Sequence, residues 1–89
     1  MNFEFDSKKA RLNLNKHGIS FSDLEPVFYD DLGLTREDED ALEQRFITVG
    51  LDAQLRLVTV CWTQRHENIR LISARLATSN ERKAYENRI

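Results

Sequence analysis

In the first twenty residues, apolar and polar positions recur with the spacing of a helix. The pattern predicts a helix over Lys8–Lys16, with a stripe formed by Ala10, Leu14 and His17. Asp6 or Ser7 is the expected cap, because either side-chain oxygen can accept a hydrogen bond from a free N–H of the first turn. Gly18 supplies the left-handed residue at which the helix ends.

A second, short helix is predicted to open at Ser20–Asp23 and to end near Tyr29. Its apolar stripe is formed by Phe21, Leu24, Val27 and Phe28. Ser22 and Glu25 have the spacing of a capping box. Pro26 is tolerated only in or beside the first turn, where at most one backbone hydrogen bond is lost. A turn over residues 30–33 and an acidic loop over residues 36–44 are expected to follow.

Beyond the acidic loop the pattern changes to the period of two that is typical of strands. Arg45–Asp52 places its apolar residues on one face, and Leu55–Thr63 is apolar on both faces, which predicts a central strand. Ile69–Arg75 is the next strand, after a hairpin loop over residues 65–68. Phe3–Phe5 alternates and predicts a short strand or an anchored arm.

The end of the chain returns to helical signals. Thr78 and Glu81 have capping-box spacing and predict a helix to about Asn87. Short connections favour an antiparallel sheet of about three to four strands. Two helices, then strands, then a helix form an α+β pattern, and 89 residues fit a single domain over residues 1–89.

Composition sets the expected environment. Hydrophobic residues make up 40 % of the chain and charged residues 31 %, which suits a packed core under a charged surface. Cys61 is the one cysteine, so no internal disulfide can form and a reducing compartment is expected. The N-terminal residues do not resemble a signal peptide, and no apolar run approaches the roughly 20 residues of a membrane span. We therefore expect a soluble cytoplasmic protein without a membrane segment.

The formal net charge of −2 hides an asymmetry along the chain. Residues 1–43 hold eleven acidic and five basic residues, whereas residues 44–89 hold four acidic and eight basic ones, seven of them arginine. Arginine presents a planar fork that fits phosphate, so the second half suits an anionic partner. Ordinary solvated surface charge is the alternative interpretation.

Short sequence motifs that follow one another along nearly the whole chain resemble those of the BrnT family of toxins. The motifs are Phe3-Glu4-Phe5-Asp6 with Lys9 and Asn13, Asn13 to Gly18 with Phe21, Gln44-Arg45-Phe46 with Gly50, Thr63-Gln64-Arg65, Ile69 to Arg75, and Thr78 to Glu86. The chain departs from the family pattern at Phe5, often tryptophan, at Leu32, often proline, and at Gln44, often glutamate. None of these departures removes a candidate catalytic group.

The resemblance implies a RelE-like ribonuclease fold and metal-independent cleavage of mRNA by the toxin of a type II toxin–antitoxin system. It also implies a cognate BrnA-type antitoxin with a ribbon-helix-helix DNA-binding domain, in a hetero-oligomeric complex with the toxin. These implications come from the resemblance alone and go beyond what composition or periodicity indicates.

Metal-free RNA cleavage needs a base for the ribose 2′-hydroxyl, cations for the phosphate oxygens and an acid for the leaving oxygen. Arg75 is the first candidate clamp, since it ends a strand on the same face as Ser73. Arg45 and Arg65 lie at strand ends, where they can converge on one rim or merely protect a sheet edge. Arg70 is expected on the opposite side from Arg75 and ranks lower.

His17 is the candidate proton carrier, because histidine exchanges protons near neutral pH. A histidine at a helix C-terminus can equally well only interact with the helix dipole. Lys16 offers positive charge or, if desolvated, a base, and its alternative is a solvated last-turn lysine. Tyr85 shares a helix face with Arg82 and could donate a proton or stack on a base, or it could belong to the core.

The remaining candidates for substrate binding are Lys9, Arg70, Ser73 and Arg82. His66 is read as a plain turn residue, and Cys61 is expected to be buried and a poor nucleophile. The sequence has no metal-ligand spacing and no glycine-rich phosphate loop, so neither metal nor cofactor is expected. Two alternatives to a nuclease stay open: a RelE-like module that binds RNA or the ribosome without cutting, and a purely structural interaction domain.

Overall fold

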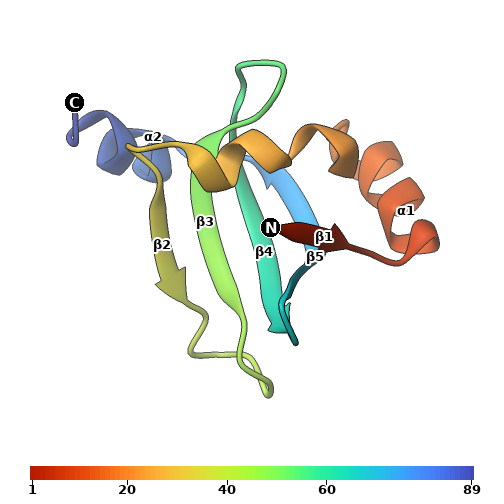
Figure 1. The fold of residues 1–89 in the computed structure, drawn as a ribbon. Coiled ribbons are helices and arrows are strands. Elements are labelled where there is room, and N and C mark those ends of the chain that lie inside the picture. Colours follow the sequence, from red (N-terminus) through yellow and green to blue (C-terminus); the bar gives the residue numbers. More distant parts are fainter.

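The sheet holds five strands in the order β1-β5-β4-β3-β2 (Figure 1). The computed structural model describes residues 1–89, and its strands are β1 (Asn2–Glu4), β2 (Leu34–Glu37), β3 (Phe46–Leu51), β4 (Leu57–Arg65) and β5 (Asn68–Leu76). The helices are α1 (Ser7–His17), the 3-10 turns η1 (Phe21–Asp23) and η2 (Glu25–Tyr29), and α2 (Ser79–Glu86). No helix has the length and apolar character needed to cross a membrane.

The α+β class is confirmed, but the expectation of a wholly antiparallel sheet of three to four strands is wrong. β1 runs parallel to β5, and the other neighbours are antiparallel. β2 lies within the segment that we expected to be turn and acidic loop. β1 corresponds to the short strand predicted at Phe3–Phe5, and its parallel pairing was not expected. β2 is four residues long, too short for a period of two to stand out. The central position of β4 is as predicted, and Val58 and Val60 on it are completely buried.

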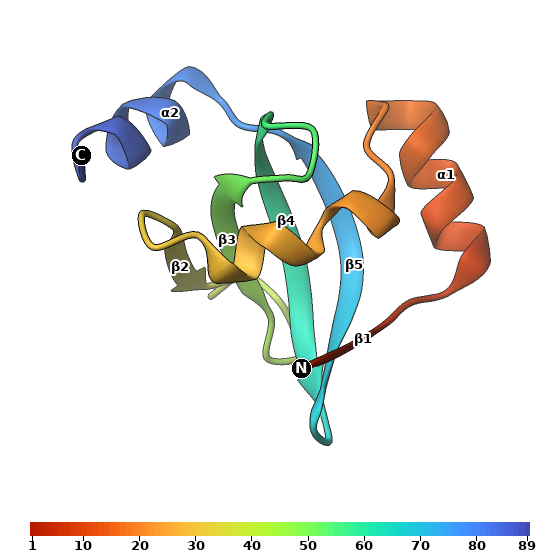
Figure 2. The same ribbon diagram turned by 45° about the horizontal axis from the view of Figure 1, so that its top comes forward.

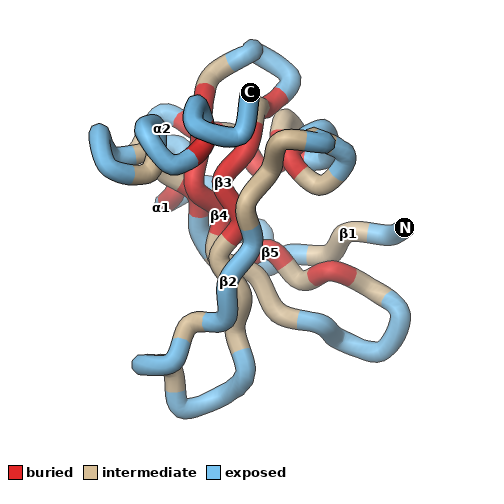
Figure 3. The backbone as a smooth tube through the Cα atoms, turned by 90° about the vertical axis from the view of Figure 1, so that its left-hand side faces the viewer, coloured by how far each residue is buried: buried red, intermediate tan, exposed pale blue.

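One face of the sheet carries the main core. Figure 2 shows η1 and η2, in orange, crossing this face, with α1 and α2 near opposite ends of the sheet. The apolar stripe predicted for residues 20–29 is buried here against Val58, Val60 and Leu71. Buried residues concentrate on the middle strands, while β2 and the connecting loops are largely exposed (Figure 3).

The second helix was predicted in the wrong form. The segment makes two 3-10 turns instead of one helix, and Pro26 lies in the first turn of η2. Proline has no N–H to donate, so a continuous helix from Ser20 would lose a hydrogen bond at this position. The expected Ser22–Glu25 capping box is absent, and Ser20 instead accepts a hydrogen bond from the N–H of Ser22.

The ends of α1 are as predicted, but its buried face is not. Asp6 caps the helix by accepting from two backbone N–H groups, and Gly18 ends it with a φ of 70°. Leu14 is 47 % exposed, and Asn13 is buried in its place. The Asn13 amide accepts from the N–H of Ala74 at 2.9 Å and donates to the carbonyls of Ala74 at 2.9 Å and Ile19 at 3.1 Å. The Asn13 side chain thus pairs with the backbone groups of Ala74 at the edge of β5, at a point that β1 does not reach.

A bulge in β5 changes which side chains share a face. Cys61 lies opposite Ser73, but the next residue of β4, Trp62, lies opposite Leu71, so Ile72 has no partner. An extra residue in one strand reverses the alternation beyond it. Arg70 therefore joins Ser73 and Arg75 on one face, which corrects the expectation that Arg70 faces the opposite side.

Two polar side chains, Glu81 and Tyr85, attach helix α2 to the rest of the fold. Its Thr78–Glu81 capping box forms as predicted. Glu81 also accepts from the hydroxyl of Thr59 at 2.9 Å and from the guanidinium of Arg75 at 2.8 and 3.1 Å. Tyr85 is buried and donates its hydroxyl proton to Asp30 at 2.8 Å.

Replacing Asn13 should destabilise the protein strongly. Asn13→Ala leaves the backbone groups of Ala74 without partners in a buried place, so we expect the free energy of unfolding to fall by about 2–4 kcal/mol. Urea denaturation measures this change. Asn15→Ala, an exposed position on the same helix, is the control and should shift it by less than about 0.5 kcal/mol. Equal stability of the two variants would contradict the role given to Asn13.

Glu81 should make the protein sensitive to acid. Hydrogen bonds from Arg75 in the first place, then from Thr78 and Thr59, lower the pKa of Glu81 from 4.5 to about 2. Its contribution is therefore complete above pH 4.5 and is lost as the pH falls toward 2. Because the Arg75 side chain is 42 % exposed, we expect a loss of only about 1–2 kcal/mol across this range.

The variant Glu81→Gln isolates this effect from other carboxyl groups. The difference in unfolding free energy between the two proteins should shrink as the pH falls from about 5 to about 2, because Gln does not titrate. Urea denaturation at several pH values gives the difference directly. A difference that stays constant over this range would show that Glu81 is not selectively stabilised in its charged form.

Candidate active site on the open face of the sheet

The face of the sheet opposite η1 and η2, here called the open face, brings the predicted site residues together. Two rows of facing residues cross β3, β4 and β5 on this face. They are Ile47, Cys61 and Ser73 in one row, and Val49, Thr59 and Arg75 in the other. Helix α2 covers Val49 and Leu57 at one end, and the row that contains Cys61 stays accessible.

The Arg75 hollow, of about 210 Å³, lies at this row. Its lining includes His17, Asp38, Cys61, Ser73 and Arg75. The predicted clamp and the predicted proton carrier therefore line the same hollow, although 58 residues separate them along the chain (75 − 17). Cys61 was expected to be buried, but it is only partly buried. This partial burial raises the pKa of its thiol.

The position of His17 depends on a partly buried ion pair between Arg56 and Asp52. His17 is the last residue of α1, and the carbonyl of the next residue, Gly18, accepts from Arg56 Nη1 at 3.1 Å. Arg56 is held by Asp52, which is 1 % exposed, through contacts of 2.9 Å from Nε and 2.8 Å from Nη2. The connection between β3 and β4 thus fixes the end of α1 that carries the histidine.

Arg75 is oriented by Glu81. Nη1 and Nη2 of Arg75 donate to the two carboxylate oxygens of Glu81, and Nη1 also donates to the carbonyl of Leu76 at 3.2 Å. The bond to Glu81 raises the pKa of Arg75, so the guanidinium stays charged. These bonds use three of the five N–H groups of arginine and leave two for a ligand.

The other cations of the open face gather in a second hollow of about 320 Å³, the Arg45 hollow. It is lined by Lys9, Glu43, Arg45, Thr63, Gln64, Arg65, Arg70 and Ile72. Arg65 and Arg70 approach Glu4 at 3.7 and 3.5 Å. A hydrogen bond from Asn68, more than the two arginines, lowers the pKa of Glu4. Two of the three arginines are thus partly neutralised.

A groove between α1 and β5 joins the two hollows. It shares His17 and Ser73 with the Arg75 hollow, and Lys9 and Ile72 with the Arg45 hollow. Lys16 lines the same groove. The open face therefore carries a continuous concave path, bordered by basic side chains, that ends at Arg75.

Two predicted residues lie away from this path. The ring of Tyr85 packs with Val49 and Leu57, and burial, followed by the bond to Asp30, raises the pKa of its hydroxyl. This is the core position left open as an alternative. Arg82 is exposed on α2 and lines neither hollow nor the groove. No three His, Cys, Asp or Glu side chains lie close enough together to form a metal-binding group.

Sequence reasoning missed three polar residues that shape the site. Glu81 was read only as part of a capping box, and nothing in the spacing indicated its bond to Arg75. Asp38 was assigned to an acidic loop, yet it lines the Arg75 hollow. Asp52 was placed at the end of the strand predicted over Arg45–Asp52, and its complete burial had no local signal.

Comparison with known proteins identifies the family of the chain. The family described as the ribonuclease toxin, BrnT, of type II toxin–antitoxin systems matches residues 5–81. Among solved structures, the chain is similar to the ribonuclease toxin BrnT of Brucella abortus, with a TM-score of 0.68 and 25 % sequence identity. The match covers 89 % of this chain and 99 % of that chain. No protein of curated function was found to match the sequence. The protein therefore belongs to the BrnT family of ribonuclease toxins of type II toxin–antitoxin systems.

Proposed function

We propose that this chain is an endoribonuclease that cleaves mRNA on the open face without a metal ion and thereby inhibits translation and growth. The observation that carries the proposal is the meeting of Arg75, His17 and Ser73 in one hollow, at the end of a path bordered by basic side chains. Family membership supports the ribonuclease activity in general. The substrate, the cellular effect and the roles of the residues are part of the proposal.

In this mechanism the RNA backbone lies along the groove and the scissile phosphate enters the Arg75 hollow. The two remaining N–H groups of Arg75 donate to phosphate oxygens, where negative charge increases in the transition state. Glu81 keeps the guanidinium in one orientation, so little reorganisation is needed when the phosphate arrives.

His17 is the proposed proton carrier. It takes the proton of the ribose 2′-hydroxyl or supplies one to the leaving 5′-oxygen, and Lys16 adds positive charge beside it. Attack of the 2′-oxygen on phosphorus forms a cyclic phosphate and breaks the bond to the 5′-oxygen. Asp38, on the same hollow, carries negative charge, so phosphate is directed to the Arg75 side.

Lys9, Arg45, Arg65 and Arg70 bind the neighbouring phosphates in this proposal. Their hollow is separate from His17, so we assign them to substrate binding and not to the chemical step. Tyr85 and Arg82 are left out of the mechanism because of their positions. A protein that binds RNA or the ribosome without cutting it is the alternative, and the cleavage experiment below separates the two.

We also propose that a BrnA-type antitoxin with a ribbon-helix-helix domain neutralises the toxin by covering the open face. A type II system pairs its toxin with an antitoxin, and the family description places this chain in such a system. The basic border of the groove would attract an acidic antitoxin segment. A complex of this kind would hide the proposed cleavage site.

RNA cleavage by the purified chain in the presence of a chelator is the first test. We expect cyclic-phosphate products from the wild type, and a rate reduced at least about 10²-fold in both His17→Asn and Arg75→Ala. Electrophoresis of a labelled RNA measures the rate, and denaturation curves check that both variants fold.

Matched controls use the same residue types outside the path. His66→Asn, at the β4–β5 turn, and Arg11→Ala, on the exposed side of α1, should cleave at the wild-type rate. Asparagine suits His66 because that residue has a φ of 56°, which asparagine tolerates. RNA binding without any product would favour the non-catalytic alternative. Loss of all cleavage with the chelator, restored by a divalent metal, would contradict metal independence.

The antitoxin encoded beside this chain should bind the open face. We expect an equimolar amount to stop RNA cleavage, and the double variant Lys9→Glu, Arg45→Glu to weaken the complex at least about tenfold, because both charges border the path. Calorimetric titration measures the affinity. Arg11→Glu, a charge reversal on the same helix outside the path, should bind like the wild type. Equal affinity of all three proteins would place the antitoxin elsewhere.

A further inference from the structure

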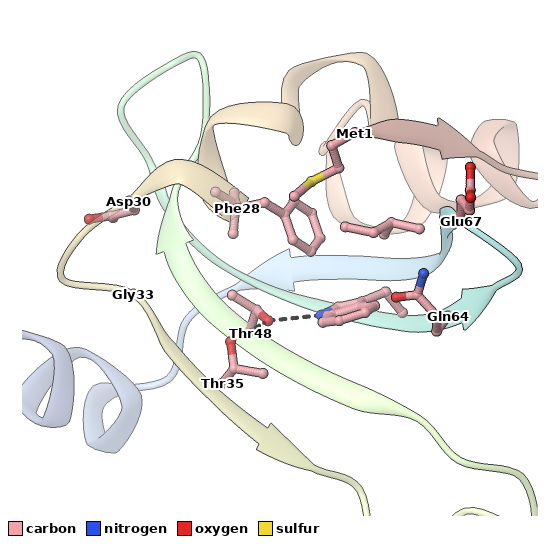
Figure 4. A pocket seen from close by; sticks show the side chains of 11 residues that line it. Met1, Phe28, Asp30, Gly33, Thr35, Thr48, Gln64 and Glu67 are labelled. Carbon is pink, nitrogen blue, oxygen red and sulfur yellow. Dashed lines mark hydrogen bonds between the residues drawn. The ribbon is translucent and has the colours of Figure 1, made fainter.

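A hollow of about 350 Å³ lies on the face of the sheet opposite the proposed nuclease site. Its walls come from the N-terminal residue, η2, β2, β3 and the β4–β5 hairpin. Its apolar surface is provided by Met1, Val27, Phe28, Trp62 and Ile69. Figure 4 shows Asp30 toward one end and Glu67 toward the other, with Phe28 between them. We call it the Trp62 hollow.

The aromatic wall is rigid. Trp62 Nε1 donates a hydrogen bond to the Thr48 hydroxyl at 2.8 Å, and that hydroxyl is also hydrogen-bonded to the Thr35 hydroxyl at 2.8 Å. Phe46 stacks on Trp62 with ring centroids 4.8 Å apart, and Phe28 meets it nearly at a right angle at 5.5 Å. Trp62 is nevertheless only partly buried, and it contributes surface to the hollow. A ligand would therefore meet a fixed aromatic surface, with little ordering needed on binding.

The hollow is negatively charged. Both carboxylates, Asp30 and Glu67, have no ion-pair partner within 4.0 Å. The lining holds no basic side chain, and its one cationic group is the N-terminal ammonium of Met1, so the acidic groups are in excess. Burial would raise the pKa of Asp30, but hydrogen bonds from Leu51, Tyr85 and Leu32 outweigh it and lower the pKa, so this carboxylate stays charged. The covering segment, residues 20–31, adds Asp23, Glu25 and Asp31 and contains no basic residue.

We propose that the Trp62 hollow binds an arginine side chain presented by a basic segment of a partner protein. A guanidinium group stacks on aromatic rings and is attracted by the nearby carboxylates. Glu67 is exposed and makes no hydrogen bond through its side chain, so it is free to accept from the guanidinium. A nucleotide is disfavoured, because its phosphate would meet two carboxylates and a single cationic group, the N-terminal ammonium of Met1.

The charge of the two faces supports this assignment. The open face is bordered by basic side chains, whereas the Trp62 hollow lies under an acidic segment on the opposite face. A basic segment is attracted to the second face and repelled from the first. The partner therefore binds without competing for the path proposed for RNA, and this inference does not depend on catalysis.

Trp62 is the only tryptophan of the chain, so its fluorescence reports on this hollow directly. The probe is a twelve-residue peptide of alternating arginine and serine, and the matched peptide carries neutral citrulline at each arginine. We expect a saturable change of Trp62 fluorescence, with the arginine peptide binding at least about tenfold more tightly than the citrulline peptide.

Two variants with the same change of charge test the location. Glu67→Gln, at the exposed turn, should weaken binding of the arginine peptide about three- to tenfold. Glu39→Gln, an exposed acid on the β2–β3 connection that does not line the hollow, should change it less than about twofold. Circular dichroism shows that both proteins are folded.

Four outcomes would overturn the proposal. They are the absence of any saturable fluorescence change, equal affinity for the two peptides, equal weakening by Glu67→Gln and Glu39→Gln, and tighter binding of adenosine monophosphate than of the arginine peptide. The last result would make the hollow a nucleotide site. Because no measurement involves RNA cleavage, failure here leaves the proposed nuclease function untouched, and failure of the cleavage test leaves this proposal untouched.

Discussion

The bulge in β5 is the constraint on which the arrangement of this protein depends. If β5 alternated strictly, Leu71 and Ala74 would point to opposite faces of the sheet, because they are three positions apart. Both are buried in the main core, at 2 % and 1 % exposure. The bulge lets one strand fill the core along its whole length. The same reversal of the alternation in β5 brings both Arg70 and Arg75 to the open face. The bulge is therefore the structural cause of the core packing and also of the clustering of arginines on the open face.

Polar side chains then place the two helices that complete the site. Asn13 attaches α1 to the edge of β5, and the Asp52–Arg56 pair fixes the end of α1 at Gly18, next to His17. Glu81 attaches α2 to the sheet and at the same time orients Arg75. In a chain of 89 residues the apolar core is small, and buried hydrogen bonds supply directional contacts that apolar packing lacks.

The sequence predicted the local features and missed most of the contacts between distant residues. The caps at Asp6, Gly18 and Thr78 could be predicted because capping depends on a few neighbouring residues. The central strand β4 could be predicted because both of its faces are apolar. The 3-10 turns, the edge strand β2, the parallel pairing of β1 and the bulge could not, since each depends on tertiary packing that overrides a short pattern.

The residues of the candidate site likewise divide into those that could be predicted from the sequence and those that could not. His17, Ser73 and Arg75 could be selected by residue type and by family resemblance, and they line one hollow. Arg70 was expected on the wrong face because the phase of β5 is invisible in the sequence. Tyr85 was ambiguous because a helical stripe does not say what covers it. Glu81 was overlooked because its second role requires Arg75 and Thr59 to be adjacent across the sheet.

Separation of charge between the two faces follows from the order of the chain. The acidic first half supplies η1, η2 and β2, which cover or border the core face. The arginine-rich second half supplies β4 and β5. Some side chains of these two strands point to the core and the others point to the open face. The core positions of these strands must be apolar, so their arginines are confined to the open face or to the strand ends. Helix α1, in the first half, adds Lys9 and Lys16 to the open face. The two-layer fold therefore becomes electrostatically polar without a separate basic domain. One small domain can then offer one face to an anionic chain and the other to a cationic one.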